Sequence, residues 1–113
     1  MMEKGITWKD FAKAEIRIGT ITEVEFFEEA RVPAFKLKID FGEYGTRRTS
    51  AQITTLYTED KLIGMQVTAV VNIPPKQIAG FMSECLILGA VGDNNEVTLI
   101  HPEREVRNGL RIG

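Results

Sequence analysis

The sequence has very little cysteine or histidine. Cys85 and His101 are the single examples among its 113 residues. One cysteine cannot form an intramolecular disulfide, and this pair matches no recognised metal-ligand spacing. Cys85 begins the apolar run 85–88, where a cysteine usually behaves as a small hydrophobe. A catalytic Cys85–His101 dyad is the one enzymatic alternative, and the expected burial of Cys85 disfavours it. We therefore expect no enzyme activity, no catalytic residue, no metal and no cofactor.

Long apolar runs and an excess of positive charge are also lacking. No run approaches the roughly 18 apolar residues of a membrane-spanning helix, and residues 1–5 lack the apolar stretch of a signal peptide. We expect a cytoplasmic protein without membrane insertion. The net charge is −2, from 14 Lys and Arg against 16 Asp and Glu. This balance argues against tight phosphate binding, although a local basic patch could still exist.

The residues that are present indicate a globular β protein. Hydrophobic residues make up 43% and charged residues 27% of the chain, close to globular averages, and the length suits one domain over residues 1–113. Thr7 and Asp10 predict a capped helix over residues 8–13. Strands are predicted at residues 15–26, 35–41, 46–53, 66–72, 84–91 and 96–100. A short helix is expected within residues 53–63, ending at Gly64.

This order of elements predicts an all-β fold. About five short strands, with one short helix before them and another between strands 3 and 4, favour the five-stranded OB-fold barrel. Residues 72–84 are expected to form a surface loop that Pro74 and Pro75 stiffen. Phe81 and Met82 in this loop could present an apolar binding surface, or could close one end of the barrel.

Several motifs resemble those of a known family. Residues 15–19, 48–50, 72–75, 80 and 83 are similar to the tRNA-binding domain of free tRNA-binding proteins and methionyl-tRNA synthetases. From about residue 10 to the end, the chain more closely resembles the CsaA-type secretion chaperones, with motifs at residues 30–34, 50–53, 70–72, 74–75, 78–80, 108–109 and 112–113.

The resemblance implies an OB-fold homodimer that binds unfolded or export-bound polypeptides at apolar surfaces. No phosphate-binding loop of the G-x-x-x-x-G-K-[ST] type occurs in the sequence, which agrees with chaperoning that needs no ATP. The expected partners are unfolded preproteins or peptides and the protein-export machinery. The candidate peptide-binding residues are Phe81, Met82, Ile78, Phe27, Phe35 and Phe26. Alternation along the strands places Phe26 and Phe35 most at risk of being core instead.

A tRNA-binding module is the alternative function. Its candidate residues are Arg47, Arg48, Ser50, Asn72, Lys76 and Ser83. In the tRNA-binding relatives, the stretch after the asparagine carries basic residues where this chain has Pro74, Gln77 and Ala79. Because each lost phosphate contact lowers affinity, tRNA binding is expected to be weak unless arginines elsewhere compensate.

The C-terminal residues 106–113 are short and β-prone. We expect them to pair across the twofold axis of the homodimer.

Overall fold

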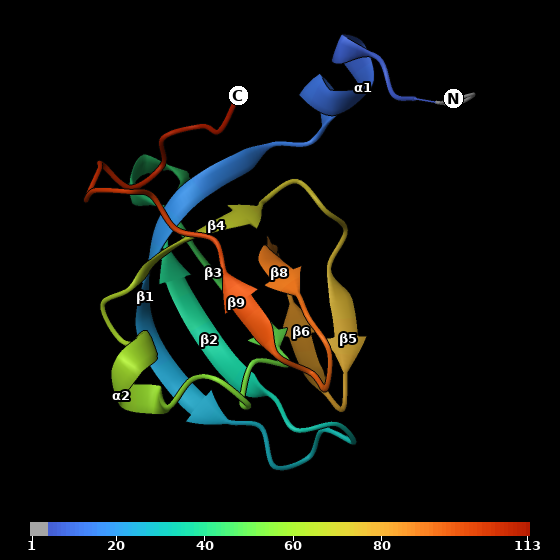
Figure 1. The fold of residues 1–113 in the computed structure, drawn as a ribbon, viewed down its shortest axis with the longest axis vertical. Coiled ribbons are helices and arrows are strands. Elements are labelled where there is room, and N and C mark those ends of the chain that lie inside the picture. The colour runs from blue at the N-terminus through green and yellow to red at the C-terminus, as the bar shows by residue number, and fades with distance from the viewer. Residues whose placement is uncertain (1–4) are drawn as a thin grey trace.

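A strongly bent antiparallel sheet forms the body of the molecule. The computed structural model describes residues 5–113, so residues 1–4, which belong to the stretch inspected for a signal peptide, lie outside the described residues. Five strands form the main sheet in the order β3-β2-β1-β4-β7. Their bounds are β1 Ile16–Phe26, β2 Phe35–Asp40, β3 Thr46–Ala51, β4 Gln66–Val70 and β7 Leu86–Ile87. The predicted all-β OB-fold architecture is confirmed (Figure 1).

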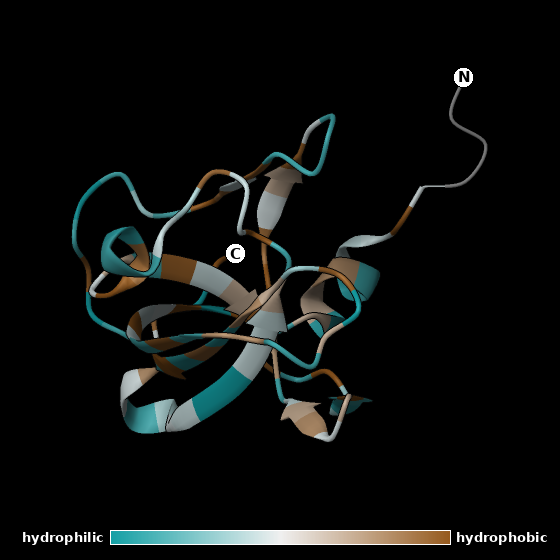
Figure 2. Ribbon diagram, turned by 90° about the horizontal axis from the view of Figure 1, so that it is seen from below, coloured by the Kyte–Doolittle hydropathy of each residue, from teal (hydrophilic) through white to brown (hydrophobic). Residues whose placement is uncertain are grey.

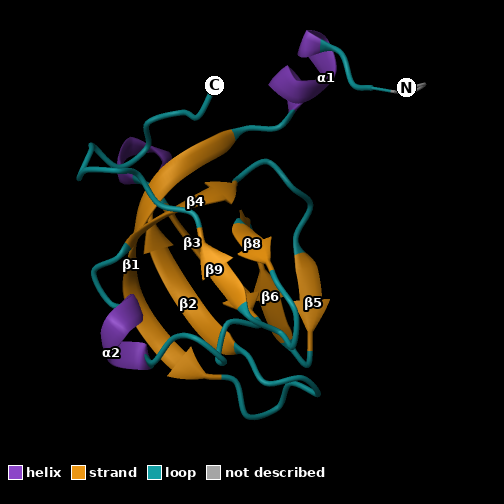
Figure 3. Cartoon of the chain, in the orientation of Figure 1, coloured by secondary structure: helices purple, strands orange, loops and turns teal. Residues whose placement is uncertain are grey.

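Two hairpins complete the barrel. β5 (Lys76–Ile78) pairs with β6 (Phe81–Ser83), and β8 (Gly89–Val91) pairs with β9 (Val97–Leu99). Figure 3 shows the strands forming the wall of the barrel while the helices lie at its periphery. The β5–β6 hairpin falls in the stretch that we expected to be a loop. Its turn residues Ala79 and Gly80 have φ values of 46° and 81°, the positive values that a tight two-residue hairpin needs.

Alternation along the strands fills the core. In β2, Phe35, Leu37 and Ile39 are buried, while the intervening lysines face outward, and bands of apolar and polar residues alternate along the ribbon in Figure 2. In β1, however, a register shift between Ile21 and Glu23 changes which residues point inward. Ile21 and Val24, three positions apart, therefore both face the core, where simple alternation would have placed them on opposite faces.

Gly19 lies where β1 crosses the barrel interior. A Cβ atom at this position would come within 2.6 Å of Ile39 and 2.7 Å of Phe41. The close approach of these two core side chains requires glycine here.

Two short helices flank the barrel. α1 (Trp8–Lys13) has the predicted capping box, because Asp10 N donates to Thr7 Oγ1 at 3.0 Å and Thr7 N donates to the Asp10 carboxylate at 3.2 Å. α2 (Glu59–Leu62) buries Leu62, and Gly64 just beyond it has a φ of 87°. A one-turn 3-10 helix, η1 (Gly42–Tyr44), joins β2 to β3.

The C-terminal segment pairs with its own chain. Ile18 N donates to Leu110 O at 2.9 Å, Gly109 N to Ile18 O at 2.8 Å, and Ile112 N to Ile16 O at 2.8 Å. The expectation that residues 106–113 pair across a twofold axis is therefore wrong. β2 pairs with residues 20–26 of β1 and leaves the backbone groups of the preceding residues free on the same edge. The C-terminal segment forms its hydrogen bonds with these groups.

Candidate binding face

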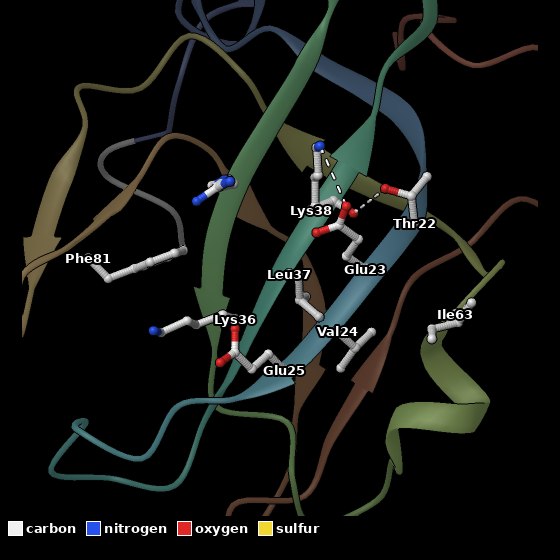
Figure 4. A pocket seen from close by; sticks show the side chains of 10 residues that line it. Thr22, Glu23, Val24, Glu25, Lys36, Leu37, Lys38, Ile63 and Phe81 are labelled. Carbon is white, nitrogen blue, oxygen red and sulfur yellow. Dashed lines mark hydrogen bonds and ion pairs between the residues drawn. The ribbon is translucent and has the colours of Figure 1, made fainter.

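The outer face of β1, β2 and β3 carries two rows of charged and polar side chains. Glu23 lies opposite Lys38, which lies opposite Arg48; in the next row Glu25 lies opposite Lys36, which lies opposite Ser50. The Lys38 ammonium is 3.6 Å from the Glu23 carboxylate. Except for Ser50, these side chains line a hollow of about 560 Å³ that Phe81 borders on one side and Ile63 on the other (Figure 4).

One end of this face is aromatic. The rings of Phe27 and Phe81 meet edge to face with centroids 5.4 Å apart. The Lys36 ammonium lies 4.7 Å from the Phe27 centroid and 5.4 Å from that of Phe81, and 3.9 Å from the Glu29 carboxylate. Lys36 is thus held by two rings and one carboxylate.

The β5–β6 hairpin is fastened to β3 by side chains that substitute for a regular ladder. Ser50 N donates to Ser83 Oγ at 2.9 Å, and the two serine hydroxyls are 3.1 Å apart. Arg48 N donates to the Glu84 carboxylate at 2.9 Å, and Glu84 N donates to Arg48 O at 2.7 Å. Ser50 and Ser83 therefore have a structural task as well as their predicted place in a tRNA site.

The other predicted tRNA-binding residues do not form one patch. Arg48 reaches the outer face, whereas the neighbouring Arg47 has a buried Nε without a hydrogen-bond partner among the described residues. Asn72 is engaged with the backbone: its Oδ1 accepts from Glu15 N at 2.8 Å and its Nδ2 donates to Lys13 O at 2.7 Å. Lys76 is exposed at the start of β5.

Two other arginines with the potential to compensate are also occupied. Arg17 donates to the Glu15 carboxylate at 2.7 Å and to Gly109 O at 2.7 Å, and its guanidinium lies 3.6 Å from the Tyr44 ring centroid. The bond from Arg17 lowers the pKa of Glu15 below its ordinary value. Arg111 donates to Ala12 O at 2.8 Å.

The predicted peptide-binding residues divide into core and surface. Phe27 and Phe35 are 1% and 6% exposed, so neither side chain is available to a ligand in this structure. Phe26 is 45% and Met82 47% exposed, while Ile78 and Phe81 are half-buried. Alternation correctly flagged Phe35, but Phe26 lies at the open end of the barrel, where its ring meets that of Phe35 edge to face.

A second hollow, of about 340 Å³, opens where β3, β7 and β9 approach the β5–β6 hairpin. Its lining includes the predicted residues Ser50, Lys76, Ile78 and Ser83. Sequence reasoning missed its remaining apolar residues, which are Ala51, Ile53, Ile73, Pro74, Cys85, Leu86, Ile87 and Val97. The signal was weak because these residues come from four separate segments that only the fold brings together.

The cysteine and histidine are placed differently. Cys85 is buried in the barrel, and burial raises the pKa of its thiol to about 12. His101 is exposed after β9, with its Nδ1 2.9 Å from Pro102 O.

Among residues 5–113, no group of three or more His, Cys, Asp or Glu side chains is arranged to hold a metal ion. In the same range, no helix has the length and apolar character to cross a bilayer.

Sequence reasoning also missed an apolar surface on α1. Trp8 is 93% and Ile6 72% exposed, and both line a hollow together with Phe11 and Gly113. α1 buries none of its residues and projects from the barrel (Figure 1). Asn72 and Arg111 nevertheless bind its C-terminal carbonyl groups, so the helix is held in place while its apolar side chains face outward.

Comparison with known proteins gives consistent relatives. A family described as "Putative tRNA binding domain" matches residues 16–111. The crystal structure of the chaperone CsaA of Bacillus anthracis is 50% identical, with a TM-score of 0.93 over 97% of this chain and 100% of that one. The CsaA chaperone protein of Picrophilus torridus is 48% identical, with a TM-score of 0.90 over 96% and 100%.

A third relative is a much longer protein. Methionine–tRNA ligase of Helicobacter pylori (strain J99) is 39% identical over 110 residues, which are 97% of this chain and 16% of the ligase. The chain thus spans about a sixth of the length of the curated relatives it matches.

Proposed function

The chain belongs to the family of putative tRNA-binding domains, and from this premise we propose that it is an ATP-independent chaperone that binds unfolded or export-bound polypeptides. It acts in the cytoplasm, upstream of the protein-export machinery. It holds its clients without catalysing a reaction, since its one thiol is buried and protonated at neutral pH. The two chaperone structures support this proposal because they match 97% and 96% of this chain and 100% of their own chains.

The observation that carries the proposal is the apolar hollow beside the β5–β6 hairpin. It has room for one or two apolar side chains, and Ile73 and Leu86 stand partly exposed at it. Lys76 is the one charged side chain in the described lining. An extended polypeptide could place an apolar residue here and lose water-exposed surface, which is favourable by about 25 cal/mol per Å².

Binding of tRNA is the second candidate, and the family membership and the ligase relatives favour it. Lys36, Lys38 and Arg48 would be its phosphate contacts, because they lie on the strands where OB folds bind oligonucleotides. Acidic side chains flank these cations, however, so we expect this activity to be weak.

We further propose that the protein is a homodimer whose contact includes the apolar side chains of α1. An isolated helix of six residues is unstable in water, and here two backbone contacts hold it with Trp8 and Ile6 uncovered. A twofold contact would cover these side chains with the same side chains of a second copy.

The deciding experiment titrates the protein with a labelled unfolded polypeptide and with labelled tRNA at two salt concentrations. Apolar capture should change little with salt, whereas phosphate binding should weaken steeply. Polypeptide binding with a shallow salt dependence supports the chaperone. Steep tRNA binding without polypeptide capture would replace it with the tRNA-binding module.

A further inference from the structure

The charged rows on the outer face have a fixed order of sign. Glu23 and Glu25 lie on β1, Lys38 and Lys36 lie directly opposite them on β2, and Arg48 lies on β3. Beyond Arg48, the Glu84 carboxylate accepts from the Arg48 backbone N–H. Lys38 and Lys36 therefore each face a carboxylate on β1, and Lys36 also lies 3.9 Å from the Glu29 carboxylate. Glu84 adds a negative charge beside the backbone of Arg48, so the face carries no excess of positive charge.

Stability does not explain these carboxylates. The side chains of Glu23 and Lys38 are 67% and 38% exposed, and their charged atoms are 3.6 Å apart. Ion pairs of this kind contribute little to folding because water and salt screen them. Their larger effect is on the electrostatic potential above the face, which governs whether a polyanion accumulates there.

The position of the two glutamates matters because of the fold. The central strands of an OB barrel present the usual surface for oligonucleotides, and single-stranded nucleic acid binds through a cationic groove with aromatic groups on which bases stack. This face retains three cations and the half-buried ring of Phe81. In such a groove the lysines are free to bind phosphate, whereas here Lys36 and Lys38 lie opposite carboxylates on β1.

We propose that Glu23 and Glu25 are specificity-determining residues that exclude nucleic acid from this face of the barrel. Glu23 holds Lys38 in a local pair, Glu25 lies opposite Lys36, and both carboxylates repel a phosphate that approaches these lysines. The face is thereby left to ligands without a dense negative charge. This inference goes beyond the proposed chaperone function, because it states which residues prevent RNA binding and does not depend on where a polypeptide binds.

The test is the double variant Glu23→Gln, Glu25→Gln, with a labelled 12-nucleotide oligouridine as the probe. The glutamines retain the length and hydrogen-bonding capacity of the side chains and remove both negative charges. At low salt we expect the variant to bind the probe at least about tenfold more tightly than the unchanged protein. Loss of the Glu23 pair frees Lys38, which should also steepen the log–log salt dependence by about 0.7, the value for one single-strand contact.

The matched control is Glu103→Gln, Glu105→Gln, which makes the same change in net charge in a loop that lines a different hollow. A further variant adds Lys36→Gln and Lys38→Gln to the first pair and should abolish the gain. Melting curves of all variants establish that they are folded.

The inference is overturned if the control gains as much affinity as the face variant, because bulk charge would then be the cause. It is also overturned if the face variant gains nothing, or if the unchanged protein already binds the probe with a steep salt dependence. A parallel titration with unfolded polypeptide separates the two proposals. If the unchanged protein does not bind unfolded polypeptide, the chaperone function is contradicted. The role of the glutamates is decided by the oligouridine titration alone.

Discussion

Phe81 meets Phe27 edge to face at 5.4 Å, and this contact joins the β5–β6 hairpin to the core of the barrel. Phe27 is buried, whereas Phe81 is half-buried, and the next residue, Met82, points to solvent. Adjacent residues of β6 thus have different tasks, because side chains alternate between the two faces of a strand. Phe81 is a hairpin anchor, and Met82 is available to a ligand.

Single substitutions should separate these tasks. Phe81→Ser removes an aromatic pair and part of an apolar contact, at a cost of about 2 kcal/mol, and should lower Tm by roughly 10 °C. Met82→Ser should change stability by less than about 0.5 kcal/mol, and it tests whether a bound polypeptide also contacts the exposed side of β6, outside the hollow. Melting curves and peptide titrations of both variants make the comparison. Equal destabilisation by the two changes would show that Met82 is also packed in the folded protein.

Removing residues 106–113 should destabilise the fold itself. The deletion breaks the backbone bonds from residues 109–112 to Ile16 and Ile18 and leaves this part of the β1 edge unpaired. We expect a markedly lower Tm in thermal unfolding followed by circular dichroism. Deletion of Gly113 alone breaks none of these bonds and is the control. An unchanged Tm for the longer deletion would contradict the role of the tail as a β1 partner.

The apolar surface of α1 should control the state of association. Ile6→Ser with Trp8→Ser removes two exposed apolar side chains that make no core contact. Light scattering should report twice the 12.7 kDa of one chain for the unchanged protein and a single chain for the variant. The control is Val91→Ser, which alters another highly exposed apolar residue away from α1. A variant that remains dimeric would place the interface elsewhere.

The thiol of Cys85 should be inert in the folded protein. Its pKa is raised to about 12 by burial, whereas an unfolded thiol ionises near about 8.5. Ionisation therefore favours the unfolded state as pH rises above about 8.5, and the contribution of the buried neutral thiol to stability is lost progressively from there towards pH 12. A thiol reagent at pH 8 should label the protein only after denaturant is added. Rapid labelling of the native protein would contradict this assignment.

Sequence patterns predicted the elements whose signals are local. The Thr7–Asp10 capping box and the alternation of Phe35, Leu37 and Ile39 depend on neighbouring residues, and both appear in the structure as expected. The β5–β6 hairpin was missed because Ala79 is an unusual residue at positive φ and because each strand has three residues. A one-residue register shift in β1 likewise left no mark in the sequence.

The candidate site was less predictable than the fold. Asn72 and Ser83 belong to the motifs that resemble the family. Their hydrogen bonds connect residues more than thirty positions apart, and such contacts cannot be read from the spacing of residues along the sequence. The burial of Phe27 next to the exposed Phe26 depends on where β1 ends. The pairing of Glu23 with Lys38 required the register of two strands and was visible only once they were aligned.

Cations placed on the β5–β6 hairpin should create affinity for tRNA. Pro74, Gln77 and Ala79 occupy the positions at which tRNA-binding relatives are expected to carry basic residues, and all three lie on or next to this hairpin. The variant Pro74→Lys, Gln77→Lys, Ala79→Arg should bind tRNA more tightly than the unchanged protein. Ala79 already has a positive φ, so an arginine there adds little backbone strain beyond what the alanine bears.

The salt dependence of that variant locates the contact. Each cation that meets a phosphate changes the log–log slope by roughly −0.7 to −0.9, so three contacts should change it by about −2 to −3. The matched control places three lysines on the β8–β9 hairpin, as Asn94→Lys, Asn95→Lys and Thr98→Lys, which are exposed positions. A steeper slope for the first variant alone means that the β5–β6 hairpin faces RNA. Equal slopes for the two variants would mean that added charge, wherever it lies, is what tRNA recognises, and the hairpin would then have no special place in tRNA binding.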